Sequence, residues 1–242
     1  MYMKASDRSR NIWGRDGSDG LRRGFLITID GPAGSGKSTV SKLLARKLSY
    51  CCLDTGALYR AVAYQVLQKG IDGADEEGIA DLCGRTDIRL HRFDHALRVF
   101  VEGQDVTEII RGEPIGLLAS TLSALPAVRA ALMPIQRETA KYGGIVAEGR
   151  DMGTVVFPEA DVKFFLDAET EERVRRRWQE LDMRGESVNY ESLKEDLLSR
   201  DRQDRERVIA PLKVPENAIL IDSTGVDIDE VVNAMLSVIP GE

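Results

Sequence analysis

The chain has few of the residues from which metal sites and disulfide frameworks are built. Its 242 residues include three cysteines and two histidines. Cys51, Cys52 and Cys83 are odd in number and lack the paired spacing of a zinc site, so a structural metal or a disulfide scaffold is not expected. This cysteine usage favours a reducing compartment, and we predict the cytoplasm. We expect both histidines, His91 and His95, to be surface residues.

Long apolar runs and an excess of positive charge are also missing. No segment approaches the about 20 apolar residues that a transmembrane helix needs. Asp and Glu number 40 against 33 Lys and Arg, a formal net charge of −7. A negative balance argues against a nucleic-acid coat or a membrane-surface protein. We therefore expect no nucleic-acid or membrane partner, and we expect a monomer.

The most informative stretch is a glycine-rich loop between a strand pattern and a helix pattern. Residues 25–29 are an apolar run, and residues 38–48 carry leucine and valine at helical spacing. The loop fits the P-loop pattern, in which backbone N–H groups and a helix N-terminus bind phosphate. A chance glycine turn is the competing explanation, and the flanking strand and helix argue against it. We assign ATP binding to Gly31, Pro32, Ala33, Gly34, Ser35, Gly36, Lys37, Ser38 and Thr39.

Two residues of this loop have predicted chemical roles. Lys37 would reach the β- and γ-phosphates of ATP, and we expect its ammonium to face solvent when no ligand is bound. The Ser38 hydroxyl would bind the Mg²⁺ that accompanies ATP. Asp30 and Asp167, each at a strand end, are two open alternatives for holding the metal through water.

The rest of the chain alternates strand and helix patterns, as a parallel sheet covered by helices requires. Strands are expected at residues 50–53, 145–148, 162–166 and 218–221. Helices are expected at 57–69, 126–141, 170–179, 191–205 and 229–238. Between 87 and 113, short alternating stretches predict a small antiparallel sheet inserted into this α/β core. We interpret the polar, glycine-rich residues 1–24 as a disordered leader.

Arginines scattered through otherwise acidic sequence narrow the class of P-loop protein. A kinase that moves a phosphoryl group between two anionic molecules needs guanidinium groups, because they offset the repulsion between donor and acceptor phosphates. A regulatory GTPase would need an Asn-Lys-x-Asp segment to bind guanine, and none occurs. The sequence therefore favours a small-molecule kinase.

Four segments in one order resemble bacterial-type cytidylate kinases. They are DGPAGSGKS at 30–38, LDTGALYR at 53–60, EGRDMGTVVFP at 148–158 and RDRQDRERVIAPL at 200–212. The resemblance covers about residues 25–239. It implies an α/β fold with a P-loop parallel-sheet core, helices on both faces, a small inserted α+β acceptor domain and a short helical lid. The implied boundaries are a core at 25–84 and 114–239, an NMP-binding insertion at about 85–113 and a lid at about 170–190.

The resemblance also implies an acceptor site. Thr55 stands where the family has serine, and it keeps the hydroxyl. Tyr59 could equally be a core aromatic, Arg60 a solvated helix charge, and Arg150 with Asp151 a structural ion pair. The implied CMP-binding residues are Thr55, Tyr59, Arg60, Ser120, Arg129, Arg150, Asp151, Arg200, Asp204 and Arg207.

Helical geometry supports part of this assignment. Arg200, Asp204 and Arg207 share one helix face, and Arg202 points away from it. A solvated, salt-bridged helix is the competing explanation.

A second basic face is expected on the predicted lid helix. Arg173 and Arg177 stand four residues apart, with Arg176 beside them. We expect this face to close on ATP and to support the migrating charge. The competing explanation is a solvated face paired with Glu169, Glu171 and Glu172. The catalytic residues that we predict are Lys37, Arg150, Arg173 and Arg177.

The function that we predict is Mg²⁺-dependent transfer of phosphate from ATP to CMP or dCMP, a step of pyrimidine metabolism. Phosphoryl transfer works by positioning and electrostatic stabilisation, so no Ser, Cys or His nucleophile is needed. One alternative is a kinase for another nucleotide or small molecule. The other is a non-catalytic, nucleotide-gated binding protein, against which the acceptor arginines argue, because a switch has no second phosphate to bind.

Overall fold

The computed structural model describes residues 24–186 and 188–240, so residues 1–23 of the predicted leader lie outside it. The predicted strands and helices are all present, with bounds shifted by at most four residues. The elements, in chain order, are β1 (Leu26–Asp30), α1 (Lys37–Lys47), β2 (Cys51–Asp54), α2 (Thr55–Lys69), α3 (Glu76–Arg85), β3 (Ile88–Phe93), β4 (Ala96–Val101), β5 (Gln104–Asp105), the 3₁₀ turn η1 (Ile109–Arg111), α4 (Glu113–Leu122), α5 (Pro126–Ala140), β6 (Ile145–Gly149), the π-helical turn η2 (Met152–Val156), β7 (Val162–Asp167), α6 (Thr170–Met183), α7 (Tyr190–Glu206), β8 (Ile219–Asp222) and α8 (Ile228–Val238).

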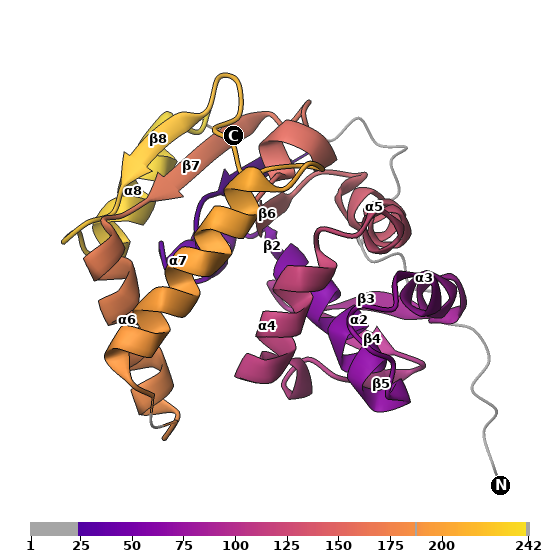
Figure 1. Ribbon diagram of the computed structural model, residues 1–242. Helices are drawn as coiled ribbons and strands as arrows, with labels where there is room; N and C mark the ends of the chain where they lie inside the picture. The colour runs from indigo at the N-terminus through magenta and orange to yellow at the C-terminus, as the bar shows by residue number, and fades with distance from the viewer. Residues whose placement is uncertain (1–23, 187, 241–242) are drawn as a thin grey trace, which may run out of the picture.

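One sheet in the order β3-β4-β2-β6-β1-β7-β8 forms the centre, and β5 pairs with β4 (Figure 1). Strands β2, β6, β1, β7 and β8 run parallel, with Leu26 opposite Ile145 at the start of the β1–β6 ladder. Side chains alternate between the faces of a strand. Ile27 and Ile29 therefore pack in the core cluster shared with α1 and α8, and Leu26 packs in the cluster that contains Ala140 of α5. The predicted parallel sheet with helices on both faces is confirmed.

The antiparallel strands expected between 87 and 113 extend the same sheet. Strands β3 and β4 pair antiparallel from Ile88–Val101 to Phe93–Ala96. Strand β4 then joins the parallel part through Cys52 of β2 opposite Ala96. Valines of this hairpin pack on Ala57 and Ala61 of α2. The division into a core and a separate insertion stays a prediction, since the strands are continuous in the sheet.

Two helices, α3 and α4, were not predicted. Helix α3 buries only Ile79 fully, with Leu82 and Cys83 partly buried beside it, so its apolar stripe is a single turn long. Helix α4 begins with Glu113-Pro114 and is apolar around most of its circumference, which hides the helical period. No single helix among the described residues is long and apolar enough to cross a membrane; α4 and α5, bent by 102°, pass that test only as a pair.

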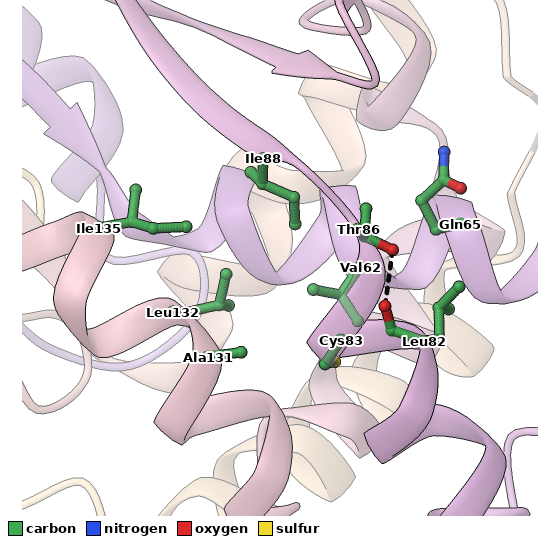
Figure 2. A pocket seen from close by; sticks show the side chains of 9 residues that line it. All are labelled: Val62, Gln65, Leu82, Cys83, Thr86, Ile88, Ala131, Leu132 and Ile135. Carbon is green, nitrogen blue, oxygen red and sulfur yellow. Dashed lines mark hydrogen bonds between the residues drawn. The ribbon is translucent and has the colours of Figure 1, made fainter.

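Helices α2, α3 and α5 and strand β3 enclose a small apolar pocket, which Figure 2 shows. Its walls carry no charged side chain, and the Thr86 hydroxyl facing it already donates to the Leu82 carbonyl at 2.8 Å. A phosphate-bearing ligand would find no partner there. The lining residues are Val62, Gln65, Leu82, Cys83, Thr86, Ile88, Ala131, Leu132 and Ile135.

The parallel strands place their carboxyl ends at one edge of the sheet. The P-loop follows β1, Asp54 ends β2, and Gly149 ends β6. In open α/β sheets, ligands bind at this edge. It is here that α4, α6 and α7 stand over the sheet (Figure 1).

Candidate active site

One large cleft at this edge brings together most of the predicted site residues. Its lining includes residues 33–39 of the P-loop and all ten predicted CMP-binding residues, which lie on α2, α4, α5 and α7 and directly after β6 and α7. Arg177 lines the same cleft. Gly31, Pro32 and Arg173 do not belong to its lining. The individual roles of these residues stay predictions.

The P-loop backbone requires glycine at Gly31 and Gly34, and it leads into a helix whose first amide groups have no side-chain cap. A Cβ on Gly31, at φ +154°, would lie 2.0 Å from the Leu166 carbonyl oxygen. A Cβ on Gly34, at φ +74°, would lie 2.8 Å from the Arg173 carbonyl oxygen. Helix α1 begins at Lys37 with Gly36 as its N-cap, so no side chain occupies its first N–H groups. These amides face the cleft as an anion site.

Lys37 does not face solvent, and that expectation was wrong. Its side chain is 6% exposed, and Nζ donates to the Pro32 carbonyl at 2.5 Å and to Ser35 Oγ at 3.3 Å. Burial and the neighbouring charge of Arg150 lower the pKa of Lys37 to about 7. The loop thus holds its own lysine through a backbone carbonyl until an anion offers a better partner.

Glu148, to which the sequence analysis gave no role, meets the P-loop from the end of β6. Ser38 Oγ donates to Glu148 Oε2 at 2.8 Å. Burial and the charge of Asp54 raise the pKa of Glu148 to about 7. Its other oxygen, Oε1, is buried and has no hydrogen-bond partner among the described residues. The sequence feature that could have pointed to Glu148 is an acidic residue at the carboxyl end of a buried strand.

The two aspartates considered for the metal are placed elsewhere. Both oxygens of the buried Asp30 accept backbone hydrogen bonds, from Met152 N at 2.8 Å and Gly153 N at 2.7 Å. Asp167 accepts from Ala168 N at 2.8 Å. Neither belongs to the lining of the cleft, whereas Glu148 does. Asp30 therefore fixes the turn η2 after β6.

Asp30 should make stability depend on pH. Burial, which outweighs the two backbone hydrogen bonds, raises its pKa from 3.8 to about 6. A raised folded-state pKa contributes stability that is complete below 3.8 and is lost as the pH rises through about 6. Urea unfolding should show the wild type losing roughly 1 kcal/mol relative to Asp30→Asn between pH 5 and pH 7. The same pH dependence in both proteins would contradict this account.

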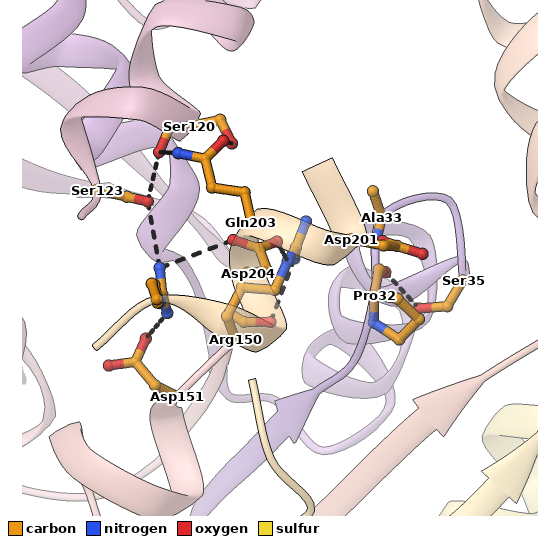
Figure 3. Close-up of polar contacts among 12 residues, drawn as sticks. Pro32, Ala33, Ser35, Ser120, Ser123, Arg150, Asp151, Asp201, Gln203 and Asp204 are labelled. Atoms are coloured by element: carbon orange, nitrogen blue, oxygen red, sulfur yellow. Dashed lines mark hydrogen bonds and ion pairs between the residues drawn. The ribbon is translucent and has the colours of Figure 1, made fainter. Parts of the chain in front are cut away.

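A buried network around Asp151, part of which Figure 3 shows, forms one part of the cleft wall. Asp151 forms ion pairs with Arg129 and, at 3.4 Å, with Arg207, and all three side chains are at most 5% exposed. Burial raises the pKa of Asp151 more than the two arginines lower it. Ser123, not predicted from the sequence, binds both arginines through its carbonyl and hydroxyl oxygens. A carboxylate is thus held rigidly at the cleft wall.

Helix α7 supplies a further part of the cleft wall. Arg150 Nε donates to Asp204 Oδ2 at 2.7 Å, and Asp204 also pairs with Arg207 at 3.7 Å (Figure 3). Arg202 is exposed on the far side of the helix, as the spacing predicted. Ser120 of α4 exchanges hydrogen bonds with Gln203 at 3.5 and 3.2 Å, which ties α4 to α7.

The structure bears on the competing explanations for two α2 residues, Tyr59 as a core aromatic and Arg60 as a solvated charge. Tyr59 belongs to a buried apolar cluster and lines the cleft, with the Arg129 guanidinium 5.8 Å from its ring centre. Thr55 Oγ1 donates to the Glu148 carbonyl at 2.7 Å. Arg60 is half-buried and is not a solvated surface charge.

The arginines of α6 fall into different environments. Arg173, 3% exposed, donates to the carbonyls of Ala33 and Ala168, both at 3.0 Å, and pairs with Asp201 of α7. Asp201 in turn accepts from Ala33 N at 3.3 Å, as Figure 3 shows in part. The Ala33 carbonyl and amide groups are therefore bonded to side chains of α6 and α7. Arg173 thus contacts the P-loop on a side that does not line the cleft.

The three α6 arginines that follow, Arg175, Arg176 and Arg177, line the cleft. Arg176 donates to Ser223 Oγ at 3.0 Å and to the Ser35 carbonyl at 3.5 Å, and it pairs with Glu172. Arg177 pairs with Glu180 at 2.7 Å and with Glu113 of α4. The pairing with Glu172 that the competing explanation named is thus present for Arg176, although the two side chains are only 25% and 14% exposed, and Arg177 pairs with other carboxylates.

Comparison with known proteins agrees with this geometry. The family model described as Cytidylate kinase matches residues 27–241. A cytidylate kinase of Geobacter sp. strain M21 is 51% identical over 212 residues, which cover 88% of this chain and 91% of that protein. One from Carboxydothermus hydrogenoformans is 48% identical over 213 residues, covering 88% and 96%. An uncharacterized protein from Eubacterium ventriosum has a similar solved fold, with a TM-score of 0.51, 13% identity and coverage of 90% and 99%.

Proposed function

Because the chain belongs to the cytidylate kinase family, we propose that it transfers the γ-phosphoryl group of ATP to CMP and dCMP. The observation that carries this proposal is the single cleft, with a P-loop at one end and a buried arginine–carboxylate network at the other. A nucleotide switch needs the first feature only. We place the reaction in the cytoplasm, which the three free cysteines support, and we expect the protein to act as a monomer.

The donor end would bind the ATP phosphates through the open amides of the P-loop. Lys37 Nζ would exchange the Pro32 carbonyl for a phosphate oxygen, and its pKa would rise beside that negative charge. An oxygen of the CMP phosphate then forms a bond to Pγ while the bond from Pγ to the ADP oxygen breaks. Positive side chains stabilise the charge that spreads over the three equatorial oxygens. We assign this role to Lys37, Arg150 and Arg177.

The residues present fit a magnesium ion at Ser38. Its hydroxyl and the unpaired Glu148 Oε1 are both at the cleft, and carboxylate and hydroxyl oxygens are ligands that Mg²⁺ accepts. The described residues hold no group of three or more acidic, His or Cys side chains that could bind a metal ion by themselves, so substrate phosphates and water would supply the remaining ligands. When bound, the ion would neutralise phosphate charge. Glu148 would hold the Ser38 side chain in its orientation.

The acceptor end would distinguish cytosine by the group at position 4 of its ring. An Asp151 carboxylate accepts a hydrogen bond from the amino group of cytosine and repels the carbonyl of uracil. Arg129 and Arg207 fix the orientation of that carboxylate. Ser120 and Asp204 line the same cleft, and we propose that Ser120 helps to bind the base and that Asp204 accepts hydrogen bonds from the ribose hydroxyls. We propose the remaining predicted acceptor residues, Thr55, Tyr59, Arg60 and Arg200, as the lining that binds the CMP phosphate and sugar.

A coupled assay with CMP, dCMP, UMP, AMP and GMP tests the proposal. We expect CMP and dCMP to be the best acceptors. Asp151→Asn should narrow the CMP-over-UMP ratio of kcat/KM by about 5- to 100-fold, because a matched buried polar contact is typically worth about 1–3 kcal/mol. The loss should come mainly from CMP.

The outcomes separate two claims. An unaltered ratio in a folded Asp151→Asn protein would place base recognition elsewhere in the cleft. Absence of phosphorylation of every nucleoside monophosphate would overturn the proposed function.

A further inference from the structure

Glu113, the first residue of α4, is a carboxylate at which arginines from three other helices converge. Oε1 accepts from Arg200 of α7 at 2.8 Å, and Oε2 pairs with Arg177 of α6. Arg60 of α2 is the third. A Cβ placed on Gly116, one turn along α4 from Glu113, would lie 3.6 Å from the Arg60 guanidinium and 3.7 Å from that of Arg200. All four side chains line the large cleft.

Glu113 offsets the positive charge of the arginines around it. The pKa of Glu113 lies below its usual value, because the charges of Arg200, Arg177 and Arg60 outweigh the opposing effect of burial. The pKa of Arg60 is lowered by burial, and Arg111, Arg177 and Arg200 lower it further despite Asp54. Like charges this close repel one another strongly where water is partly excluded. Glu113 therefore supplies the negative charge that holds this group of guanidinium ions together.

The arginines concerned are those to which the proposed function gives phosphate contacts. A carboxylate presents two oxygens and one negative charge, so guanidinium groups bind it with the geometry that they also use for phosphate. The Glu113 side chain is 25% exposed, which leaves it open to exchange with a ligand from the cleft. A phosphate that enters must compete with this carboxylate for Arg177 and Arg200.

We propose that Glu113 is an internal counter-ion, which occupies the place of a phosphate among Arg60, Arg177 and Arg200 in the nucleotide-free protein and is displaced by the phosphates of the substrates. This role rests on the proposed function for the identity of those phosphates. Glu113 then sets how tightly anions bind, and it favours their release after transfer. It is a positioning residue and takes no part in the bond changes.

Glu113→Gln tests the proposal, because it keeps the shape and removes the charge. The first measurement is calorimetric binding of inorganic pyrophosphate to the nucleotide-free protein, without turnover. Removal of a charged competitor should tighten binding by about 5- to 20-fold. Thermal unfolding of the nucleotide-free variant should occur at a lower temperature than that of the wild type, and pyrophosphate should restore most of the difference. The KM for CMP should fall, while kcat stays constant or falls.

Two further variants supply the controls. Glu113→Asp keeps the charge and should bind pyrophosphate within about threefold of the wild type. Glu180→Gln removes a carboxylate that pairs with Arg177 but is 43% exposed and does not contact Arg200, so a change below about twofold is expected. Unchanged or weaker pyrophosphate binding in Glu113→Gln would overturn the proposal. Because binding is measured without an acceptor, this result stands apart from any failure of the CMP kinase assay.

Discussion

Replacement of Lys37 by alanine is expected to lower kcat by about 100- to 1000-fold, because a preorganised cation is lost where negative charge develops in the transition state. The fold should survive the change. Within the described part of the chain, Lys37 Nζ donates hydrogen bonds to the Pro32 carbonyl and to Ser35 Oγ, both in its own loop. Its lowered pKa shows that the burial of this ammonium is unfavourable, so its removal relieves a cost.

Steady-state kinetics with saturating ATP and CMP, together with circular dichroism, would test this expectation. Lys47→Ala is the matched control: it removes a lysine from the far end of the same helix, where Lys47 contacts Asn233 and Asp229. That variant should keep wild-type turnover. A folded Lys37→Ala protein with unchanged kcat would show that this loop does not bind the transferred phosphate.

Asp204→Ala should raise the KM for CMP by about 10- to 100-fold, raise that for dCMP less, and leave that for ATP nearly unchanged. The carboxylate holds Arg150 at 2.7 Å and Arg207 at 3.7 Å. Its loss would both misplace two acceptor arginines and remove a partner of the ribose hydroxyls. A buried charge-assisted contact of this kind is typically worth about 1.5–3 kcal/mol. The smaller effect on dCMP follows from its missing 2′-hydroxyl.

Arg202→Ala provides the control, because Arg202 is exposed on the outer face of the same helix. It should be nearly silent. Since removal of Asp204 leaves buried guanidinium groups unpaired, Asp204→Asn is the second variant, which keeps the shape and should show the same order of effects. Equal losses for ATP and CMP, or like behaviour of the Asp204 and Arg202 variants, would refute the assignment.

The sequence was sufficient to predict those features that depend on neighbouring residues in the chain. Strands β1 and β6 are buried along their whole length or nearly so, and both appear in the sequence as apolar runs. The P-loop glycines are recognisable because their backbone conformation excludes other residues. The shared face of Arg200 and Asp204 follows from helical spacing alone.

The features that the sequence analysis missed depend on contacts between distant segments. Arg173 and Arg177 stand four residues apart on one face of α6. Arg173 nevertheless bonds to Ala33 of the P-loop, 140 residues away in sequence, whereas Arg177 pairs with Glu113. No periodicity separates these two environments. The roles of Glu148 and Glu113 likewise arise only when the ends of β6 and α4 meet the P-loop and α7. The orientation of Lys37 depends on the closed shape of a loop, which its residue pattern does not specify.

The hydrogen bonds at Ala33 set a mechanical limit on the proposed lid. Arg173 and Asp201 fasten the first turn of α6 and the middle of α7 to the two polar groups of one P-loop residue. A closing motion that preserves these bonds must have its fulcrum at Arg173, so residues 170–173 cannot swing with the rest. The lever arm is then the part of α6 beyond Arg173, ten residues from Val174 to Met183, which at 1.5 Å per residue is about 15 Å long. Arg176 and Arg177 lie near the fulcrum of that arm, where a large rotation produces a small displacement.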